Sequence, residues 1–77
     1  MTDDRIHDRI TQLVDEEHAL RAADHHTIED KKRLQELEVQ LDQAWDLLRQ
    51  RDALRYAGRP PGEATTRPAD EVEGYLQ

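Results

Sequence analysis

The carboxylates and imidazoles of the N-terminal half have the clearest potential for chemistry. Glu17 and His18 are adjacent, and Glu17 stands in an apolar stripe where a further leucine would be expected. Such residues can hold a metal inside a helical bundle, as in di-iron carboxylate proteins. Those proteins use Glu-x-x-His, which this sequence lacks, and an ion pair with Arg21 or Arg33 would also satisfy the carboxylate. We therefore expect a structural ion pair, with a metal-binding bundle that uses Glu17 and His18 as the alternative.

Other polar groups fit structural roles at least as well. Asp24, His25 and His26 could bind a transition metal weakly but also suit a polar turn, and Asp42 and Asp46 fit the solvated face of a helix. A basic group consists of Arg49, Arg51, Arg55 and Arg59. Cations are favoured at a helix C-terminus, and a chain with a net charge of −7 repels phosphate backbones. We therefore expect no metal and no nucleic-acid partner.

Common catalytic and targeting signatures are missing. The chain has no serine, no cysteine and no Gly-rich loop, so the commonest nucleophiles, thiolate zinc sites, disulfides and phosphate-binding loops are excluded. Its N-terminus lacks the pattern of a signal peptide, and no apolar run approaches the roughly 18 residues that cross a bilayer. The sequence predicts a cytoplasmic, non-enzymatic protein without a cofactor or a membrane partner.

An apolar stripe organises the first two thirds of the chain. A spacing of seven residues returns to nearly the same side of an α-helix. The positions on this line are Ile6, Leu13, Leu20, Thr27, Leu34, Leu41 and Leu48. Ile10, Leu37 and Trp45 lie beside it. Although 38% of the residues are charged, this periodicity predicts a folded all-α chain rather than disorder.

Capping signals divide the stripe into two helices. Asp3 or Asp4 can cap the first helix, and Thr27 with Asp30 resembles a capping box for the second. Gly58 supplies a stop, and the prolines that follow prevent extension. The expected bounds are a first helix over about 4–23, a second over about 28–57, a hairpin domain over 1–58, and a Pro/Gly linker with a C-terminal tail over 59–77.

The polar stretch between the two halves admits two architectures. The register is unbroken across Thr27, which allows one long coiled-coil helix. That helix would place Asp24, Thr27 and Lys31 at successive seam positions, which is unfavourable, whereas a turn places them in water. We favour an antiparallel two-helix hairpin.

The hairpin alone has a small core. Equal distances from the turn set Ile10 against Leu41 and direct Trp45 toward the first helix, while the longer second helix leaves Leu48 and Tyr56 uncovered. Domains of this size rarely obtain more than about 3–5 kcal/mol from one core, so we expect a homodimer that forms a four-helix bundle or coiled coil. The expected interface residues are Ile6, Ile10, Leu13, Leu34, Leu37, Leu41, Trp45, Leu48, Leu54 and Tyr56.

Two leucines point away from the main stripe. Leu47 and Leu54 are seven residues apart, and the tail carries Val72, Tyr75 and Leu76. We expect the tail to fold back onto these leucines in its own or a neighbouring subunit. The alternatives are a free C-terminal peptide bound by another protein, or disorder.

Three segments resemble one protein family. They are 14–21 (VDEEHALR), 37–51 (LEVQLDQAWDLLRQR) and 72–77 (VEGYLQ). Together they resemble a family of short, mainly actinobacterial proteins of unknown function, along almost the whole chain. The family has no established activity, so the resemblance implies no residue roles. This chain has Ala44 where the family pattern favours Cys, which argues against a thiol-based function, and its turn lacks the expected Gly or Pro, which keeps the continuous helix open. We expect a protein-protein interaction module, a small scaffold or adaptor with an unidentified partner.

Overall fold

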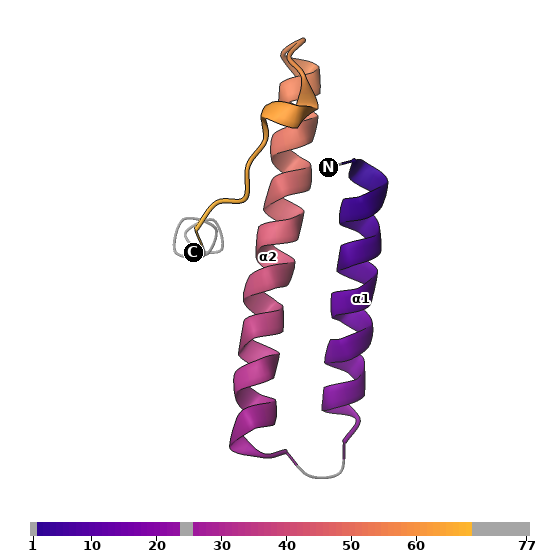
Figure 1. Cartoon of the computed structure of the whole chain (residues 1–77), viewed down its shortest axis with the longest axis vertical. Coiled ribbons are helices and arrows are strands. Elements are labelled where there is room, and N and C mark those ends of the chain that lie inside the picture. Colours follow the sequence, from indigo (N-terminus) through magenta and orange to yellow (C-terminus); the bar gives the residue numbers. More distant parts are fainter. Residues whose placement is uncertain (1, 24–25, 69–77) are drawn as a thin grey trace.

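The chain folds as a helical hairpin with a returning C-terminal segment. The computed structural model describes residues 2–23 and 26–68. It contains α1 (Asp3–Arg21), α2 (Ile28–Tyr56) and a short 3-10 helix, η1 (Pro61–Glu63). The two long helices lie side by side and antiparallel, and the chain after η1 turns back along α2 (Figure 1). This arrangement confirms the all-α hairpin, and the continuous-helix alternative is not adopted.

Helix α1 begins one residue earlier than predicted. The cap is Thr2, whose Oγ1 accepts a hydrogen bond from the backbone N–H of Arg5 at 3.3 Å. The assignment of the cap to Asp3 or Asp4 was wrong, because both residues already lie in the first turn of the helix. Their negative charges interact favourably there with the positive end of the helix dipole. The helix ends at Arg21, two residues before the expected position.

Helix α2 begins and ends with the predicted signals. The Thr27 hydroxyl accepts from the Asp30 backbone at 3.1 Å, and the Asp30 carboxylate accepts from the Thr27 backbone at 3.2 Å, which completes a capping box. At the other end Gly58 has a φ of 76°. This left-handed conformation lets the Arg59 N–H donate to the Leu54 carbonyl at 2.8 Å, as in a Schellman motif.

The core lies along the seam between the two helices. The buried apolar residues are Ile6, Ile10, Leu13, Leu37, Leu47 and Leu48. The expectation that Leu48 would be uncovered was wrong, because it packs with Ile6 and Ile10 of α1. Leu47 belongs to the same cluster, and Ala64 of the returning segment packs against it. Within residues 2–23 and 26–68, no helix has the length and apolar character needed to cross a membrane.

Candidate functional site

One edge of the seam between α1 and α2 is polar. Arg9 Nη2 donates to Gln40 Oε1 at 3.1 Å, and Arg33 donates from Nε and Nη2 to the two carboxylate oxygens of Glu16, each at 2.8 Å. The Arg33 guanidinium holds the pKa of Glu16 below its ordinary value. Within each helix the paired residues are seven positions apart, so the contacts recur along one side. Arg9, Glu16, Arg33 and Gln40 are termed the polar edge.

The opposite edge is apolar. His7 and Val14 precede Arg9 and Glu16 by two residues, which is roughly 200° around an α-helix at 3.6 residues per turn. The His7 ring meets Trp45 edge-on, with ring centroids 6.4 Å apart and planes at 80°. Val14 and Leu41 pack partly buried against the core. The residues His7, Val14, Leu34, Leu41 and Trp45 are termed the apolar edge.

The apolar edge leaves hydrophobic surface uncovered. Trp45 is 43% exposed, and Val14, Leu34 and Leu41 are each partly exposed. Trp45 was expected to face the first helix from within the hairpin, but it lies at the margin of that contact, beside His7. Its role in a dimer interface stays a prediction.

The predicted interface residues fall into two groups. Buried within the hairpin are Ile6, Ile10, Leu13, Leu37 and Leu48. Partly or largely exposed are Leu34, Leu41, Trp45, Leu54 and Tyr56. The second group contains the residues that remain accessible to a partner.

A buried carboxylate forms a site that the sequence did not reveal. Asp46 is only 2% exposed, although its helix neighbours indicated a solvated face. Arg67 donates to both of its oxygens, from Nε to Oδ2 at 2.9 Å and from Nη2 to Oδ1, and Gln50 Nε2 donates to Oδ2 at 2.8 Å. The Arg67 guanidinium lowers the pKa of Asp46 against the opposing effect of burial. The solvated-face interpretation was wrong because it could not include a residue from the returning segment.

Two glutamines of α2 hold the backbone of that segment. Gln50 Nε2 also donates to the Thr65 carbonyl at 2.7 Å, and Gln50 Oε1 accepts from the Thr65 N–H at 3.4 Å. Gln43 Nε2 donates to the Arg67 carbonyl at 3.2 Å. The residues Gln43, Asp46, Gln50, Thr65 and Arg67 are termed the clasp. Because Thr65 lies at Gln50 and Arg67 lies at Gln43, the segment runs antiparallel to α2 (Figure 1).

The described part of the return along α2 consists of Ala64, Thr65 and Arg67. Ala64, rather than an apolar residue of the tail, packs on the cluster that contains Leu47. Leu54 is partly exposed. The other residues of that prediction, Val72, Tyr75 and Leu76, lie outside the described residues. The spacing of Gln43, Asp46 and Gln50 along one helix side was the available signal for a polar docking surface.

Glu17 and His18 are not brought together as a metal site. The Glu17 carboxylate lies 3.7 Å from Arg21 Nη2, which is one of the two ion pairs expected for it. Arg33, the other expected partner, binds Glu16 instead. His18 is exposed. Among residues 2–23 and 26–68, no group of three or more His, Cys, Asp or Glu side chains is arranged to hold a metal ion.

Much of the arginine group near the end of α2 is engaged in ion pairs. Arg51 Nε and Arg55 Nη2 lie 2.5 and 2.7 Å from Asp3 Oδ1. Arg55, with Arg51, lowers the pKa of Asp3 to about 2. Arg59 binds Glu63 at 2.6 Å. These contacts fasten the start of α1 and the turn after α2.

Comparison with known sequences identifies the family. Residues 2–77 match the family described as "Protein of unknown function (DUF2630)". The chain belongs to this family. Uncharacterized protein Rv0898c of Mycobacterium tuberculosis and uncharacterized protein Mb0922c of Mycobacterium bovis are each 51% identical to it over 78 residues, covering 96% of this chain and 90% of the relative. No solved structure matches the chain.

The match confirms the resemblance to a short actinobacterial family of unknown function. In this DUF2630 chain, the clasp and the apolar edge both take residues from one part of α2. The run 37–51 contains Gln43, Asp46 and Gln50 of the clasp, together with Leu41 and Trp45 of the apolar edge. The segment that carried most of the resemblance therefore supplies the clasp and part of the exposed apolar surface.

Proposed function

We propose that this chain is a non-enzymatic protein-interaction module that pairs with a second copy of itself through the apolar edge. The asymmetry of the hairpin supports this proposal. One edge is occupied by the bonds of Arg9 to Gln40 and of Arg33 to Glu16. The other edge presents Trp45 at 43% exposure beside three partly exposed aliphatic side chains. A partner that covers the apolar edge gains hydrophobic stabilisation without breaking ion pairs.

The charge distribution favours a second copy as the occupant. The chain carries a formal net charge of −7 with histidine neutral, so two copies repel each other over most of their surfaces. The apolar edge contains no aspartate, glutamate, lysine or arginine, and Glu38, which lies between Leu34 and Leu41 in α2, is paired with Arg21 at 3.2 Å. Two copies can therefore approach at this edge with little direct charge repulsion.

The size of the core supports the same arrangement. Among the described residues only six apolar side chains are buried, and a single core in a chain of this size rarely supplies more than about 3–5 kcal/mol. Two hairpins joined at their apolar edges enclose a shared core between four helices, which is the ordinary geometry of a four-helix bundle. The surfaces away from the apolar edge then remain available to other proteins, as a scaffold or adaptor requires.

The test is the native mass of the full chain by light scattering over a range of concentrations. We expect wild type to scatter as twice its 9.0 kDa chain mass and Trp45→Glu to scatter as a monomer, because the change places a carboxylate in the apolar edge. Gln12→Glu is the matched control, since it adds the same charge at an exposed position of α1. Circular dichroism checks that all three remain helical.

Two outcomes would reject the proposal. A wild-type chain that stays monomeric at every concentration would exclude pairing with itself. A Trp45→Glu variant that remains dimeric, as Gln12→Glu is expected to, would place the interface elsewhere on the hairpin.

A further inference from the structure

The clasp brings the C-terminal segment to a particular side of α2. Gln43 and Asp46 hold Arg67, so the described chain ends, at Pro68, beside the middle of the helix. The nine residues 69–77, extended at about 3.3 Å each, reach roughly 30 Å. The distance from Gln43 back to Ile28 is roughly 22 Å at a rise of 1.5 Å per residue. The segment is therefore long enough to cover the first half of α2.

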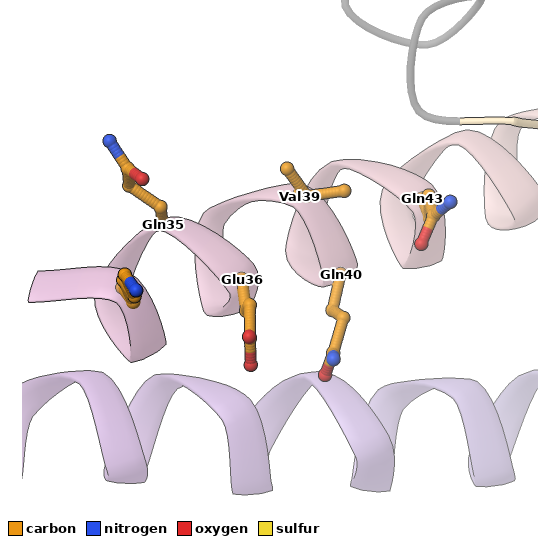
Figure 2. Close-up of a pocket in the computed structure, with 6 residues that line it drawn as sticks. Gln35, Glu36, Val39, Gln40 and Gln43 are labelled. Atoms are coloured by element: carbon orange, nitrogen blue, oxygen red, sulfur yellow. The ribbon is translucent and has the colours of Figure 1, made fainter. Parts of the chain in front are cut away.

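An open depression continues along this side of α2 beyond the clasp. Its lining consists of Lys32, Gln35, Glu36, Val39, Gln40 and Gln43. Figure 2 shows Gln35 and Val39 projecting away from the neighbouring helix, whereas Glu36 and Gln40 point toward it. Gln43 belongs both to the clasp and to the depression, so the two surfaces are continuous. All of the lining residues come from α2, and no other element of the described chain contributes to the depression.

Two lysines lie at the start of α2. Lys31 and Lys32 follow Glu29 and Asp30 in its first turns, where the helix dipole is positive, and the Asp30 carboxylate is already bonded to the Thr27 backbone. Both lysines are exposed, and neither has an ion pair within residues 2–23 and 26–68. Residues 69–77 contain three carboxylates, at Asp70, Glu71 and Glu73, and no lysine or arginine. An acidic segment directed along α2 toward its N-terminus thus approaches two exposed lysines and the positive end of the helix dipole.

We propose that residues 69–77 bind this depression in their own chain, antiparallel to α2. The carboxylates face Lys31 and Lys32, and the apolar side chains of the segment pack on Val39 and the aliphatic stems of the glutamines. This contact uses a different side of α2 from the apolar edge, so it does not depend on self-pairing. It differs from the expectation that the tail docks on Leu47 and Leu54, which concerns residues outside the described part of the chain.

The chain has no cysteine, which permits a crosslinking test with two introduced thiols. The test pair is Gln35→Cys with Val72→Cys, because an extended segment that continues from Arg67 beside Gln43 brings position 72 close to the height of position 35. The control pair is Leu34→Cys with Val72→Cys. Positions 34 and 35 are adjacent in the chain but differ by about 100° around the helix. Dilute protein is oxidised with glutathione disulfide, which accepts the two electrons released as the two thiols join. The intramolecular product is measured by mass spectrometry after free thiols are blocked.

We expect the Gln35 pair to close at least about tenfold faster than the Leu34 pair, because a disulfide requires Cα atoms within about 7 Å and docking raises the local thiol concentration. Reversal of the charges at Asp70, Glu71 and Glu73 to lysine should slow the Gln35 pair to the rate of the control. A mixture of the two single variants, Gln35→Cys and Val72→Cys, should give little crosslinked product.

Equal rates for the two pairs would overturn the proposal, since a segment that does not bind reaches both positions equally. Rapid crosslinking in the mixture of single variants would also overturn it, because the segment would then bind a neighbouring copy. Neither result bears on the light-scattering test of the apolar edge, so the two proposals can fail independently.

Discussion

The change Arg67→Met tests the clasp directly. The side chain of Asp46 is 3% exposed, whereas that of Arg67 is 31% exposed. Methionine retains much of the aliphatic stem of Arg67 but removes both of its hydrogen bonds to the carboxylate. Of the partners that the structure describes for Asp46, only Gln50 then remains. The variant therefore buries a carboxylate whose charge is no longer balanced.

The expected loss of stability in Arg67→Met follows from the burial of Asp46 and from the number of hydrogen bonds lost. Removing one partner of a fully buried ion pair costs about 3–5 kcal/mol, and one hydrogen bond to a charged group contributes about 1.5–3 kcal/mol. Because Arg67 is partly exposed, water reaches the vacated position and the lower range applies. We expect a loss of about 2–3 kcal/mol in the free energy of unfolding, or roughly 10–20 °C in the melting temperature of a chain this small.

The assay is thermal and urea unfolding at pH 7, followed by circular dichroism at one fixed protein concentration. Arg59→Met is the matched control, since its pair with Glu63 is exposed on both sides and should contribute at most about 1 kcal/mol. The difference between Arg67→Met and wild type should narrow in acid, because burial without a cation raises the pKa of Asp46 and protonation removes the unbalanced charge. Equal stability of Arg67→Met and Arg59→Met would refute the assignment of Asp46 to a buried ion pair.

Three further predictions concern stability at low pH, the turn after α2 and the N-terminal cap of α2. Arg55 and Arg51 lower the pKa of Asp3 to about 2, and Arg67 lowers the pKa of Asp46. The unfolded chain therefore binds more protons in acid than the folded chain, so this stabilisation should be complete above about pH 5 and should fall as the pH drops through the folded pKa values. Urea unfolding at several pH values measures this, and a free energy of unfolding that does not change with pH would contradict the prediction. Gly58→Ala should cost about 1–2 kcal/mol by strain alone, because φ is 76° and an added Cβ meets nothing within 4 Å; an unchanged melting temperature would count against the left-handed turn. Thr27→Ala should lose about 1 kcal/mol with the capping box, whereas Thr27→Ser should lose little, and equal losses would reject the role of the hydroxyl.

Signals that act over a few residues explain why the hairpin could be predicted from sequence. The Thr27 and Asp30 capping box and the Gly58 stop each involve groups within five residues of one another. Such contacts depend mainly on local backbone geometry, so they can be read from residue types and spacing. The choice among Thr2, Asp3 and Asp4 could not be made in this way, because all three are good caps and distant contacts contribute to the register of α1. Asp3, for example, binds two arginines of α2.

The environments of Trp45 and Asp46 could be assigned only from the three-dimensional structure. Trp45 is eight residues beyond the fully buried Leu37, which is about 80° around the helix, so it reaches the margin of the seam although it shares the apolar stripe. Asp46 is bound by a residue 21 positions later, after a turn and a 3-10 helix. Helix periodicity places Asp46 on the same side as Gln43 and Gln50, but it cannot identify Arg67 as the partner.

The clasp also imposes an order on folding during synthesis. Chains emerge from the ribosome N-terminus first, so Asp46 and both glutamines of the clasp leave the ribosome before Thr65 and Arg67. A nascent hairpin that has formed α1 and α2 carries an aspartate whose guanidinium partner has not yet been made. Its full stability is reached only when a segment 21 residues downstream has followed.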